Sequence, residues 1–414
     1  MSTTTSSAGS PALTWRTPAV VIFCGCLIAL LSFGPRSAVG QFLTPLSFAH
    51  GWGRDVFSIA LAIQNLLWGV GQPFAGAIAD RYGTIRVLCV GALLYAAGLA
   101  VMAYASTAAM LDVSAGVLIG FGLSGCSFNL VIGAFGKLLP ESWRGLGFGA
   151  GTAAGSFGQF LFSPLARALI DHFDWQSALV IFAAMMLLIL PLSITLATPR
   201  MEAPAAGAAA PQGLRSALTE AFGHRSYVLL VVGFFTCGFQ LAFVTVHLPS
   251  YLIDRGMSAE IGAWTIGIIG LFNIIGSLTS GYLINRMPRR YLLSIIYFAR
   301  AMSIVAFILA PASPTVTLIF GAVTGLLWLS TVPPTSALVA LMFGTRWLAM
   351  LFGFAFFSHQ VGGFLGVILG GYAYEHTGSY DLVWWLSVLF GVLSALINLP
   401  IKEKPVERVA TAAA

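Results

Sequence analysis

The chain has 414 residues, of which 58% are hydrophobic and only 8% are charged, whereas a soluble domain carries roughly 25% charged residues. So few charges cannot cover the surface of a water-soluble protein, which excludes that class and makes lipid the solvent for most of the chain. The formal net charge of +6 at pH 7 would fit nucleic-acid binding, but the positions of the charges indicate membrane topology instead.

Nearly continuous apolar runs predict twelve transmembrane helices. Most runs have at least the length of about 20 helical residues that crosses the hydrocarbon core, and helices satisfy their own backbone polar groups there. The first run is too long for a removable signal peptide and lacks its small-residue cleavage site. The predicted spans are 17–45, 55–79, 86–106, 110–136, 145–170, 176–197, 227–252, 262–284, 291–310, 316–342, 347–373 and 381–400.

A polar stretch after the sixth span divides the chain into two halves. The first part of residues 198–226 is rich in Pro, Ala and Gly and predicts a linker. Residues 214–222 space their apolar side chains as a helix does, which predicts a short helix on the membrane surface. We predict a cytoplasmic tail (1–16), an amino-terminal six-helix bundle (17–197), a cytoplasmic linker (198–226), a carboxy-terminal six-helix bundle (227–400) and a second cytoplasmic tail (401–414).

The basic residues favour one side of the membrane. With twelve spans, 15 of the 20 Lys and Arg residues fall on the side that holds both termini, and Arg54, Arg167 and Arg255 fall on the other. By the positive-inside rule both termini are cytoplasmic, which predicts a multi-pass protein of the plasma membrane, the inner membrane in a bacterium. The two remaining basic residues, Arg36 and Arg300, lie within apolar runs.

Two short Gly-led, Arg-rich stretches indicate an internal repeat. Residues 76–86 read GAIADRYGTIR and residues 281–290 read GYLINRMPRR, so their first glycines are 205 residues apart. Gly51 and Gly256, in the turns before the second and eighth spans, keep the same offset. A constant offset over several landmarks predicts two copies of one unit, and six-plus-six repeats with a long central loop are typical of secondary transporters.

Each stretch falls at the predicted cytoplasmic turn between the second and third spans of its half. Gly76 would let two helices approach closely. Asp80 lies at a helix end, where Arg81, Arg86 or an arginine of a neighbouring helix could pair with it. Such pairs can hold two helices together in one conformation and release them in another, so we predict a conformational latch. The alternative is that these are ordinary loop charges that set topology.

The pattern Gly-x-x-x-Asp-Arg-x-Gly, followed by basic residues, resembles the signature of the major facilitator superfamily. The resemblance covers residues 17–400 and implies an all-α integral membrane fold of two six-helix bundles related by an internal repeat. The first copy matches the pattern at Gly76, Asp80, Arg81, Gly83 and Arg86. The second copy keeps Gly281, Arg286, Arg289 and Arg290, with Asn285 in place of the acid and Pro288 in place of the second glycine.

Finer features are similar to the monocarboxylate transporter and oxalate:formate antiporter families. Residues 143–155 (WRGLGFGAGTAAG) look like a fifth-span pattern of the first family, and Arg36 occupies the position of its substrate-binding lysine. Trp328 lies 15 residues before Phe343, the spacing of a tryptophan that lines the substrate cavity in the second family. The resemblance implies a small organic anion as substrate, a mono- or dicarboxylate.

Two departures from these families argue against simple lactate or oxalate. Ser277 stands where both families carry a carboxylate-binding arginine in the eighth span. His359 stands where the oxalate antiporters carry a lysine in the eleventh span.

The cation at Arg36 is the strongest substrate-binding candidate. An arginine inside a span costs at least about 2.5–3.5 kcal/mol on insertion scales, and no carboxylate lies mid-span to offset it. An anionic ligand would offset it, and the alternative is snorkelling or contact with backbone carbonyls. Further candidate substrate contacts are Trp328, His359, Gln360, Gln240 and Asn129. Arg300 and His247 are the uncertain candidates, for which we favour a structural or gating role over substrate contact.

The missing motifs exclude other classes of function. No Gly-x-x-x-x-Gly-Lys-Ser/Thr stretch occurs, which argues against an ATP-driven pump. No nucleophile–base pair or metal cluster appears, so we expect no enzyme, cofactor or metal. We expect a monomeric secondary transporter that works by proton symport or anion exchange, since a histidine such as His359 can change charge near neutral pH. The alternatives are an exporter of drug- or siderophore-like molecules and a non-transporting membrane receptor.

Overall fold

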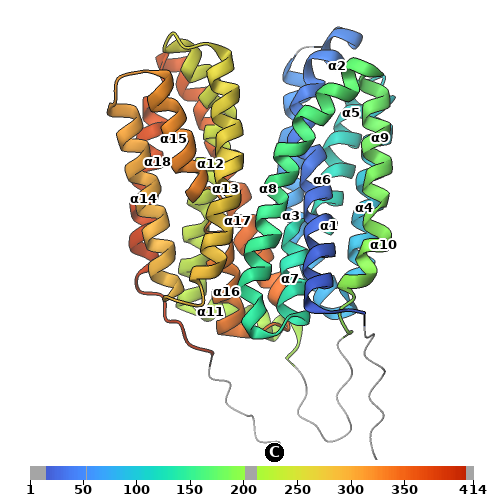
Figure 1. The fold of residues 1–414 in the computed structure, drawn as a ribbon, viewed down its shortest axis with the longest axis vertical. Helices are drawn as coiled ribbons and strands as arrows, with labels where there is room; N and C mark the ends of the chain where they lie inside the picture. The colour runs from blue at the N-terminus through green and yellow to red at the C-terminus, as the bar shows by residue number, and fades with distance from the viewer. Residues whose placement is uncertain (1–14, 53, 201–211, 407–414) are drawn as a thin grey trace, which may run out of the picture.

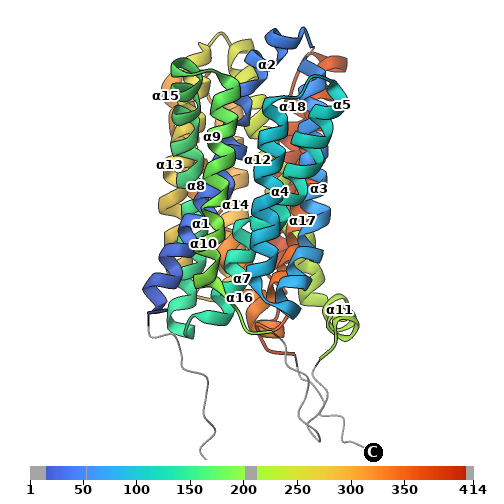
Figure 2. The same ribbon diagram turned by 90° about the vertical axis from the view of Figure 1, so that its right-hand side faces the viewer.

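The computed structural model describes residues 15–52, 54–200 and 212–406. These residues form helices and connecting turns, with no β-strand among them. The helices stand as two bundles, one from each half of the chain (Figure 1), and the long helices run along the longest axis of the molecule (Figure 2). The first and last described residues lie at the same end of the molecule, which we call the termini end.

The amino-terminal bundle contains the first six predicted spans. A π-helical turn, η2, interrupts the fourth span. Short 3-10 turns follow α1 within the first span (η1) and close the sixth span (η3). Its elements are α1 (Pro18–Ala38), η1 (Val39–Phe42), α2 (Leu43–His50), α3 (Arg54–Tyr82), α4 (Thr84–Ala103), α5 (Ala108–Leu111), η2 (Asp112–Leu118), α6 (Ile119–Cys126), α7 (Phe128–Leu138), α8 (Glu141–His172), α9 (Trp175–Leu187), α10 (Ile189–Ser193) and η3 (Ile194–Leu196).

The carboxy-terminal bundle contains the last six predicted spans. It is preceded by α11 (Leu214–Gly223), which confirms the short helix predicted within the linker. The rest of the predicted linker and both predicted tails lie partly outside the described residues. The elements of this bundle are α12 (Arg225–Asp254), α13 (Ala259–Leu283), α14 (Arg289–Leu309), α15 (Pro314–Leu327), α16 (Val332–Phe343), α17 (Leu348–Thr377) and α18 (Asp381–Asn398).

Local sequence signals begin and end these helices. The Thr17 side chain accepts a hydrogen bond from the Val20 amide at the start of α1, with Pro18 in the first turn. Such a cap satisfies one of the amides that a helix start leaves without a partner. Between α3 and α4, Gly83 has a φ of 93°, a backbone region that favours glycine. The second glycine of the predicted latch therefore forms the turn that ends α3.

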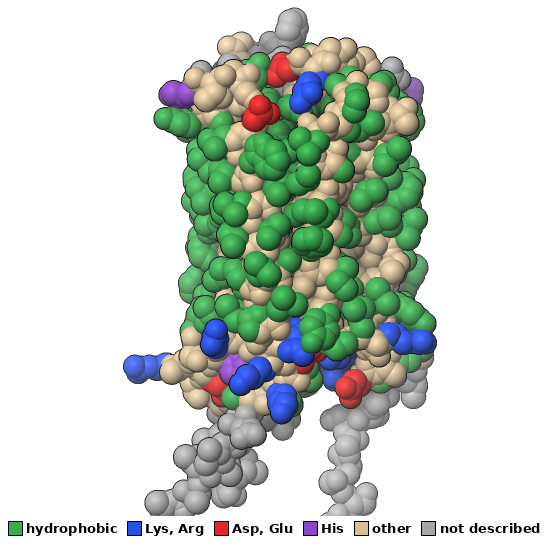
Figure 3. Space-filling model, turned by 90° about the vertical axis from the view of Figure 1, so that its left-hand side faces the viewer, with side chains coloured by type: hydrophobic (Ala, Val, Ile, Leu, Met, Phe, Trp, Pro, Cys, Tyr) green, Lys and Arg blue, Asp and Glu red, His purple; other side chains and the backbone are tan. Residues whose placement is uncertain are grey.

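Among the described residues, ten helical segments are long and apolar enough to cross a membrane. The two other predicted spans, α3 and α8, are 29 and 32 residues long but less apolar. Helix α3 carries Gln64, Asn65 and Gln72 in its middle, and α8 is rich in glycine. Both helices pack against the opposite half, where polar and small side chains meet protein as well as lipid. Figure 3 shows the resulting surface, with hydrophobic side chains over the middle and Lys and Arg gathered near the termini end.

The fourth and tenth spans are both broken in the middle. Ser127 separates α6 from α7 with extended backbone angles, φ −67° and ψ 164°. Residues 328–331 separate α15 from α16. Ser127 and Thr331 are 204 residues apart, close to the offset of the sequence repeat. The two halves therefore share an interruption as well as a helix order.

Glycine contacts join the two halves toward the termini end. A Cβ atom on Gly76 of α3 would lie 2.5 Å from the backbone of Ala349 on α17. A Cβ atom on Gly281 of α13 would lie 2.6 Å from the carbonyl oxygen of Gly145 on α8. The two leading glycines of the repeat thus occupy corresponding places in two interfaces, α3 with α17 and α8 with α13. Only glycine allows an approach this close.

Candidate substrate-binding site

Arg36 has no carboxylate partner in the part of the chain that the structure describes. It follows Pro35 near the end of α1, and its Nη2 donates a hydrogen bond to Oδ1 of Asn65 on α3. The guanidinium carbon lies 4.9 Å from the ring centroid of Trp68 and 5.8 Å from that of Phe33, within cation–π range. Among the described atoms, its buried Nε has no hydrogen-bond partner. The site therefore holds a positive charge with donor capacity to spare.

Five rings from both halves form a series of contacts beside this charge, and we call them the aromatic box: Phe33, Trp68, Phe128, Phe356 and His359. The ring centroids of Trp68 on α3 and Phe356 on α17 are 4.9 Å apart. Phe128 on α7 lies 6.3 Å from Phe33 and 6.0 Å from Phe356. His359 stacks on Phe356, with centroids 5.4 Å apart and planes at 9°. The box offers flat apolar surface next to a cation.

A polar chain crosses between the halves at the same level. The Gln360 Nε2 on α17 donates to the main-chain oxygen of Asn65, 3.4 Å away. Its Oε1 then accepts from Nδ1 of His359 at 3.3 Å. This pairing places the proton of a neutral His359 on Nδ1 and makes its Nε2 an acceptor. That Nε2 is buried and has no hydrogen-bond partner among the described atoms.

Two fully buried amides near the break in the fourth span have unused hydrogen-bonding capacity. Neither side-chain atom of Asn129 on α7 has a partner in the described structure, and its exposed fraction is 0%. Gln72 on α3 accepts from Ser127 at 2.8 Å and from Trp68 at 3.2 Å, but its Nε2 has no described partner. Buried polar atoms are usually paired, so these atoms are available to a ligand or to water.

The second buried arginine, Arg300, is occupied within its own half. Its Nη2 donates to the main-chain oxygens of Leu327 and Trp328, the latter at 2.7 Å. Its Nη1 donates to Gln240 Oε1 at 3.2 Å. The two carbonyls lie at the end of α15, where the helix dipole favours a cation. These contacts support the predicted structural role of Arg300.

The other predicted contacts of the carboxy-terminal half are also engaged by protein groups. Besides accepting from Arg300, Gln240 donates to the Ser387 oxygen at 2.8 Å. Trp328 lies in the break between α15 and α16 and is buried. On α12, His247 lies 2.9 Å from the Val367 oxygen through its Nε2, and it is not among the rings of the aromatic box. Substrate contact by these residues stays a prediction.

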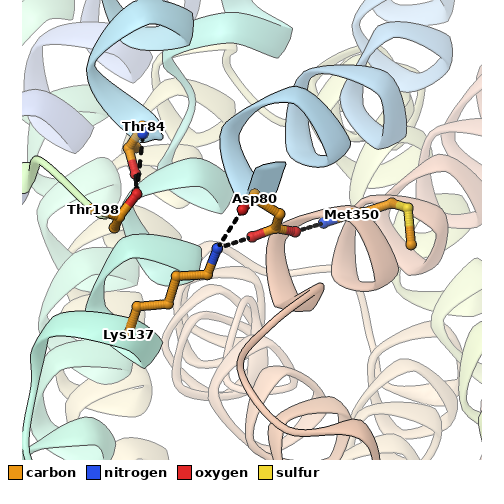
Figure 4. A network of polar contacts seen from close by, with 5 residues as sticks. All are labelled: Asp80, Thr84, Lys137, Thr198 and Met350. Atoms are coloured by element: carbon orange, nitrogen blue, oxygen red, sulfur yellow. Dashed lines mark hydrogen bonds and ion pairs between the residues drawn. The ribbon is translucent and has the colours of Figure 1, made fainter. Parts of the chain in front are cut away.

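The predicted latch residue Asp80 joins the two halves, as Figure 4 shows. Its Oδ1 forms an ion pair with Nζ of Lys137 on α7 at 2.6 Å. Its Oδ2 accepts a hydrogen bond from the Met350 amide, in the first turn of α17, at 2.9 Å. A carboxylate suits this position because the first amides of a helix lack internal partners. Beside it, the hydroxyls of Thr84 and Thr198 pair at 2.7 Å at the start of α4.

The partner of Asp80 differs from the expectation. We expected an arginine, but Arg81 and Arg86 are exposed, and Arg81 lies over the ring of Tyr82. Lys137 reaches the buried carboxylate because α7 packs against α3. Arg81 and Arg86, at the end of α3 and the start of α4, are exposed to solvent, whereas the ion pair forms between α3 and α7.

The second copy of the signature makes no comparable ion pair between the halves in the described structure. Arg286 lies over the ring of Tyr282, and the Arg290 side chain donates to the Ile401 oxygen and the Tyr291 hydroxyl. At the position of the acid, Asn285 lies beside Gly145 of α8. The repeat therefore preserves the close approach of the helices but only one charged latch.

Comparison with known proteins identifies the family. Residues 25–366 match the family model described as Major Facilitator Superfamily. The chain belongs to this superfamily. Over 374 residues it is 29% identical to an uncharacterized MFS-type transporter, YcxA, of Bacillus subtilis, covering 88% of this chain and 90% of the relative. Over 399 residues it is 25% identical to monocarboxylate transporter 13 of Rattus norvegicus, covering 92% and 88%.

A solved structure supports the fold. The E. coli fucose:proton symporter FucP aligns with a TM-score of 0.70 at 19% identity, over 92% of this chain and 97% of that one. The predicted all-α fold of two six-helix bundles is thus confirmed. The family to which the chain belongs is one of transporters, not of enzymes. The protein is a multi-pass membrane transporter of the major facilitator type.

Sequence reasoning missed most of the aromatic box and the amides of α3. Phe33, Trp68, Phe128 and Phe356 sit in apolar runs that contain many other aromatic residues. Asn65 and Gln72 gave a stronger signal, because polar amides inside a predicted span are uncommon and usually face protein.

Replacing Asp80 with asparagine is expected to slow transport severalfold while leaving substrate affinity nearly unchanged. The change replaces the charged acceptor of the Met350 amide with a neutral one, which weakens the closed interface between α3 and α17. Asp80 lies 15 residues from Asn65 on one helix, about 22 Å along its axis. Equilibrium binding and initial uptake rate, measured side by side, test this. A large loss of affinity at a normal maximal rate would contradict it.

Proposed function

We propose that this transporter carries a small organic anion, a mono- or dicarboxylate, by alternating access. The observation that carries the proposal is Arg36, a cation without a carboxylate partner among the described residues, next to rings contributed by both halves. Guanidinium groups bind carboxylates through charge-assisted hydrogen bonds. The relative named monocarboxylate transporter 13 is in line with this substrate class.

The two interfaces at the termini end support the alternating-access part of the proposal. Helices α3 and α17 meet there through Gly76 and Asp80, and α8 and α13 meet through Gly145 and Gly281. We take this arrangement as the state closed at the termini end. Rocking of one bundle against the other would open that end and close the opposite one. The Lys and Arg side chains near the termini end (Figure 3) favour a cytoplasmic orientation of that end.

Binding and flux experiments test the proposal directly. Purified protein is heated with acetate, benzoate or succinate, and with benzamide as the neutral counterpart of benzoate. A bound ligand raises the unfolding midpoint according to its concentration and Kd. Stabilisation by a carboxylate but not by benzamide, together with uptake of that carboxylate into proteoliposomes, is the expected result. Equal stabilisation by benzoate and benzamide would overturn recognition of the charge, and binding without uptake would overturn transport.

If protons move with the anion, His359 is the group we expect to carry them. Its Nε2 is an acceptor without a partner among the described atoms, and the ring stacks on Phe356 in the aromatic box. A proton on Nε2 would turn this acceptor into a hydrogen-bond donor to the bound anion, so that the proton and the anion would move together. Proteoliposomes with a pH gradient and no internal anion should then show uphill uptake that His359→Gln abolishes. Uptake that ignores the gradient and requires preloaded anion would establish exchange instead.

A further inference from the structure

We infer that Asn65 occupies the anion-binding edge of Arg36 in the absence of substrate, and that the substrate carboxylate displaces it. The inference rests on the proposed function, since it concerns the same site. Asn65 lies on α3, and its Oδ1 accepts a hydrogen bond from Nη2 of Arg36. An amide oxygen is thus seated where a carboxylate oxygen would be expected.

The geometry of the guanidinium group explains why the contact of Asn65 with Nη2 matters for carboxylate binding. It holds a carboxylate with two parallel N–H groups, either Nη1 with Nη2 or Nε with Nη2. Both pairs include Nη2, which is the atom that donates to Asn65. Nε has no partner among the described atoms. Nη2 carries two N–H groups, so a carboxylate that binds the edge on which Asn65 lies competes with the Asn65 amide oxygen for one of them, and the charged acceptor is the stronger competitor.

Asn65 also contacts the opposite half through its main chain. Its carbonyl oxygen accepts from Gln360 on α17 at 3.4 Å. One turn further along α3, a Cβ atom on Gly69 would lie 2.7 Å from Cβ of Gln360, so this part of the interface is tightly packed. Displacement of the Asn65 side chain acts on a residue that holds the contact between α3 and α17. Anion binding at Arg36 is thereby coupled to the interface between α3 and α17, which also contains the Asp80 latch.

A ligand-free double-mutant cycle tests the occupancy of Arg36. Asn65→Asp places a carboxylate where the amide oxygen lies, so it should raise the unfolding midpoint when Arg36 is present. In the Arg36→Gln background the same carboxylate has no cation and should lower the midpoint. Equal shifts in both backgrounds would overturn the inference.

Gln64→Glu is the matched control for this cycle. Gln64 is the preceding residue on α3, but its Nε2 donates to the Ala115 oxygen at 2.7 Å, away from Arg36. Its replacement adds the same charge to the same helix and loses a donor. We expect Gln64→Glu to destabilise the protein by the same amount with or without Arg36. A coupling to Arg36 as large as that of Asn65→Asp would show a general charge effect and overturn the assignment to Asn65.

A binding arm tests displacement, with benzoate, acetate and succinate as probes. Asn65→Asp should weaken binding at least about tenfold, since a tethered carboxylate competes for a charge-assisted hydrogen bond. Asn65→Ala removes the competitor and should leave binding equal or tighter. A loss with Asn65→Ala as large as that with Arg36→Ala would overturn displacement. Failure of wild-type protein to bind any of the probes would overturn displacement and count against the proposed function, whereas the ligand-free cycle would still report whether Asn65 occupies Arg36.

Discussion

Replacing Arg36 with alanine is expected to abolish anion transport without preventing folding. The guanidinium is the group proposed to bind the carboxylate, and hydrogen bonds to charged groups contribute about 1.5–3 kcal/mol each. Loss of two such bonds corresponds to a fall in affinity of at least about a hundredfold. Folding should survive because the change removes a charge that is costly inside a span. Among the described residues it leaves the half-buried Asn65 amide oxygen without its donor. Initial uptake and equilibrium binding are the measurements.

Arg300→Ala is the matched control for this experiment. Both residues are arginines within predicted spans, but Arg300 donates to Gln240 and to the carbonyls at the end of α15. Its loss should lower the unfolding midpoint, because it leaves buried acceptors without a donor, and should affect affinity less than Arg36→Ala does. Wild-type uptake by well-expressed Arg36→Ala protein would refute the assigned role of Arg36.

Replacing Gly76 with leucine is expected to reduce transport as severely by preventing closure at the termini end. A Cβ atom at this position would lie 2.5 Å from the backbone of Ala349, and backbone atoms cannot yield as a flexible side chain can. The population should shift toward conformations in which α3 and α17 are separated at this end. Labelling of a cysteine introduced at Ala349 measures the separation, with stronger labelling expected in the Gly76→Leu protein.

Gly270→Leu serves as the control for a large side chain in a glycine-containing helix. A Cβ atom on Gly270 of α13 would have no described atom within 4 Å, apart from its chain neighbours and the nearby backbone of its own helix. This variant should therefore keep wild-type labelling at position 349. Unchanged transport and labelling in Gly76→Leu protein would mean that the close approach of α3 and α17 at Gly76 is not required for turnover.

Composition and periodicity were sufficient to predict the fold. Apolar runs determine where a membrane helix lies, because lipid tolerates no unpaired backbone groups, and the offset between Gly76 and Gly281 disclosed the duplication. In the structure these two glycines occupy corresponding interfaces between the halves. The sequence also predicted that Arg36 has no carboxylate partner, because a charge inside a span is rare enough to be informative alone. Among the described residues it has none.

Pairing between distant helices could not be predicted in the same way. Asp80 accepts a hydrogen bond from the Met350 amide, which is 270 residues away in sequence. No local sequence pattern specifies that contact. The partner Lys137 was missed for the same reason, because Arg81 and Arg86 are nearer in sequence but point outward. For Trp68 and Phe356, residue type gave no hint, since aromatic side chains are abundant throughout the spans.

The placement of the latch charges has a kinetic consequence. Asp80 and Lys137 both belong to the amino-terminal bundle, and the Asp80 contact to α17 is a hydrogen bond from the Met350 main chain. When the bundles separate, the carboxylate keeps its counter-ion and gives up a neutral donor. Stripping a buried ion of its partner would cost about 3–5 kcal/mol, a penalty that would add directly to the activation barrier for turnover. Because Asp80 and Lys137 move with the same bundle, their ion pair stays intact during each transport cycle and the penalty does not arise. The hydrogen bond from α17 still favours closure.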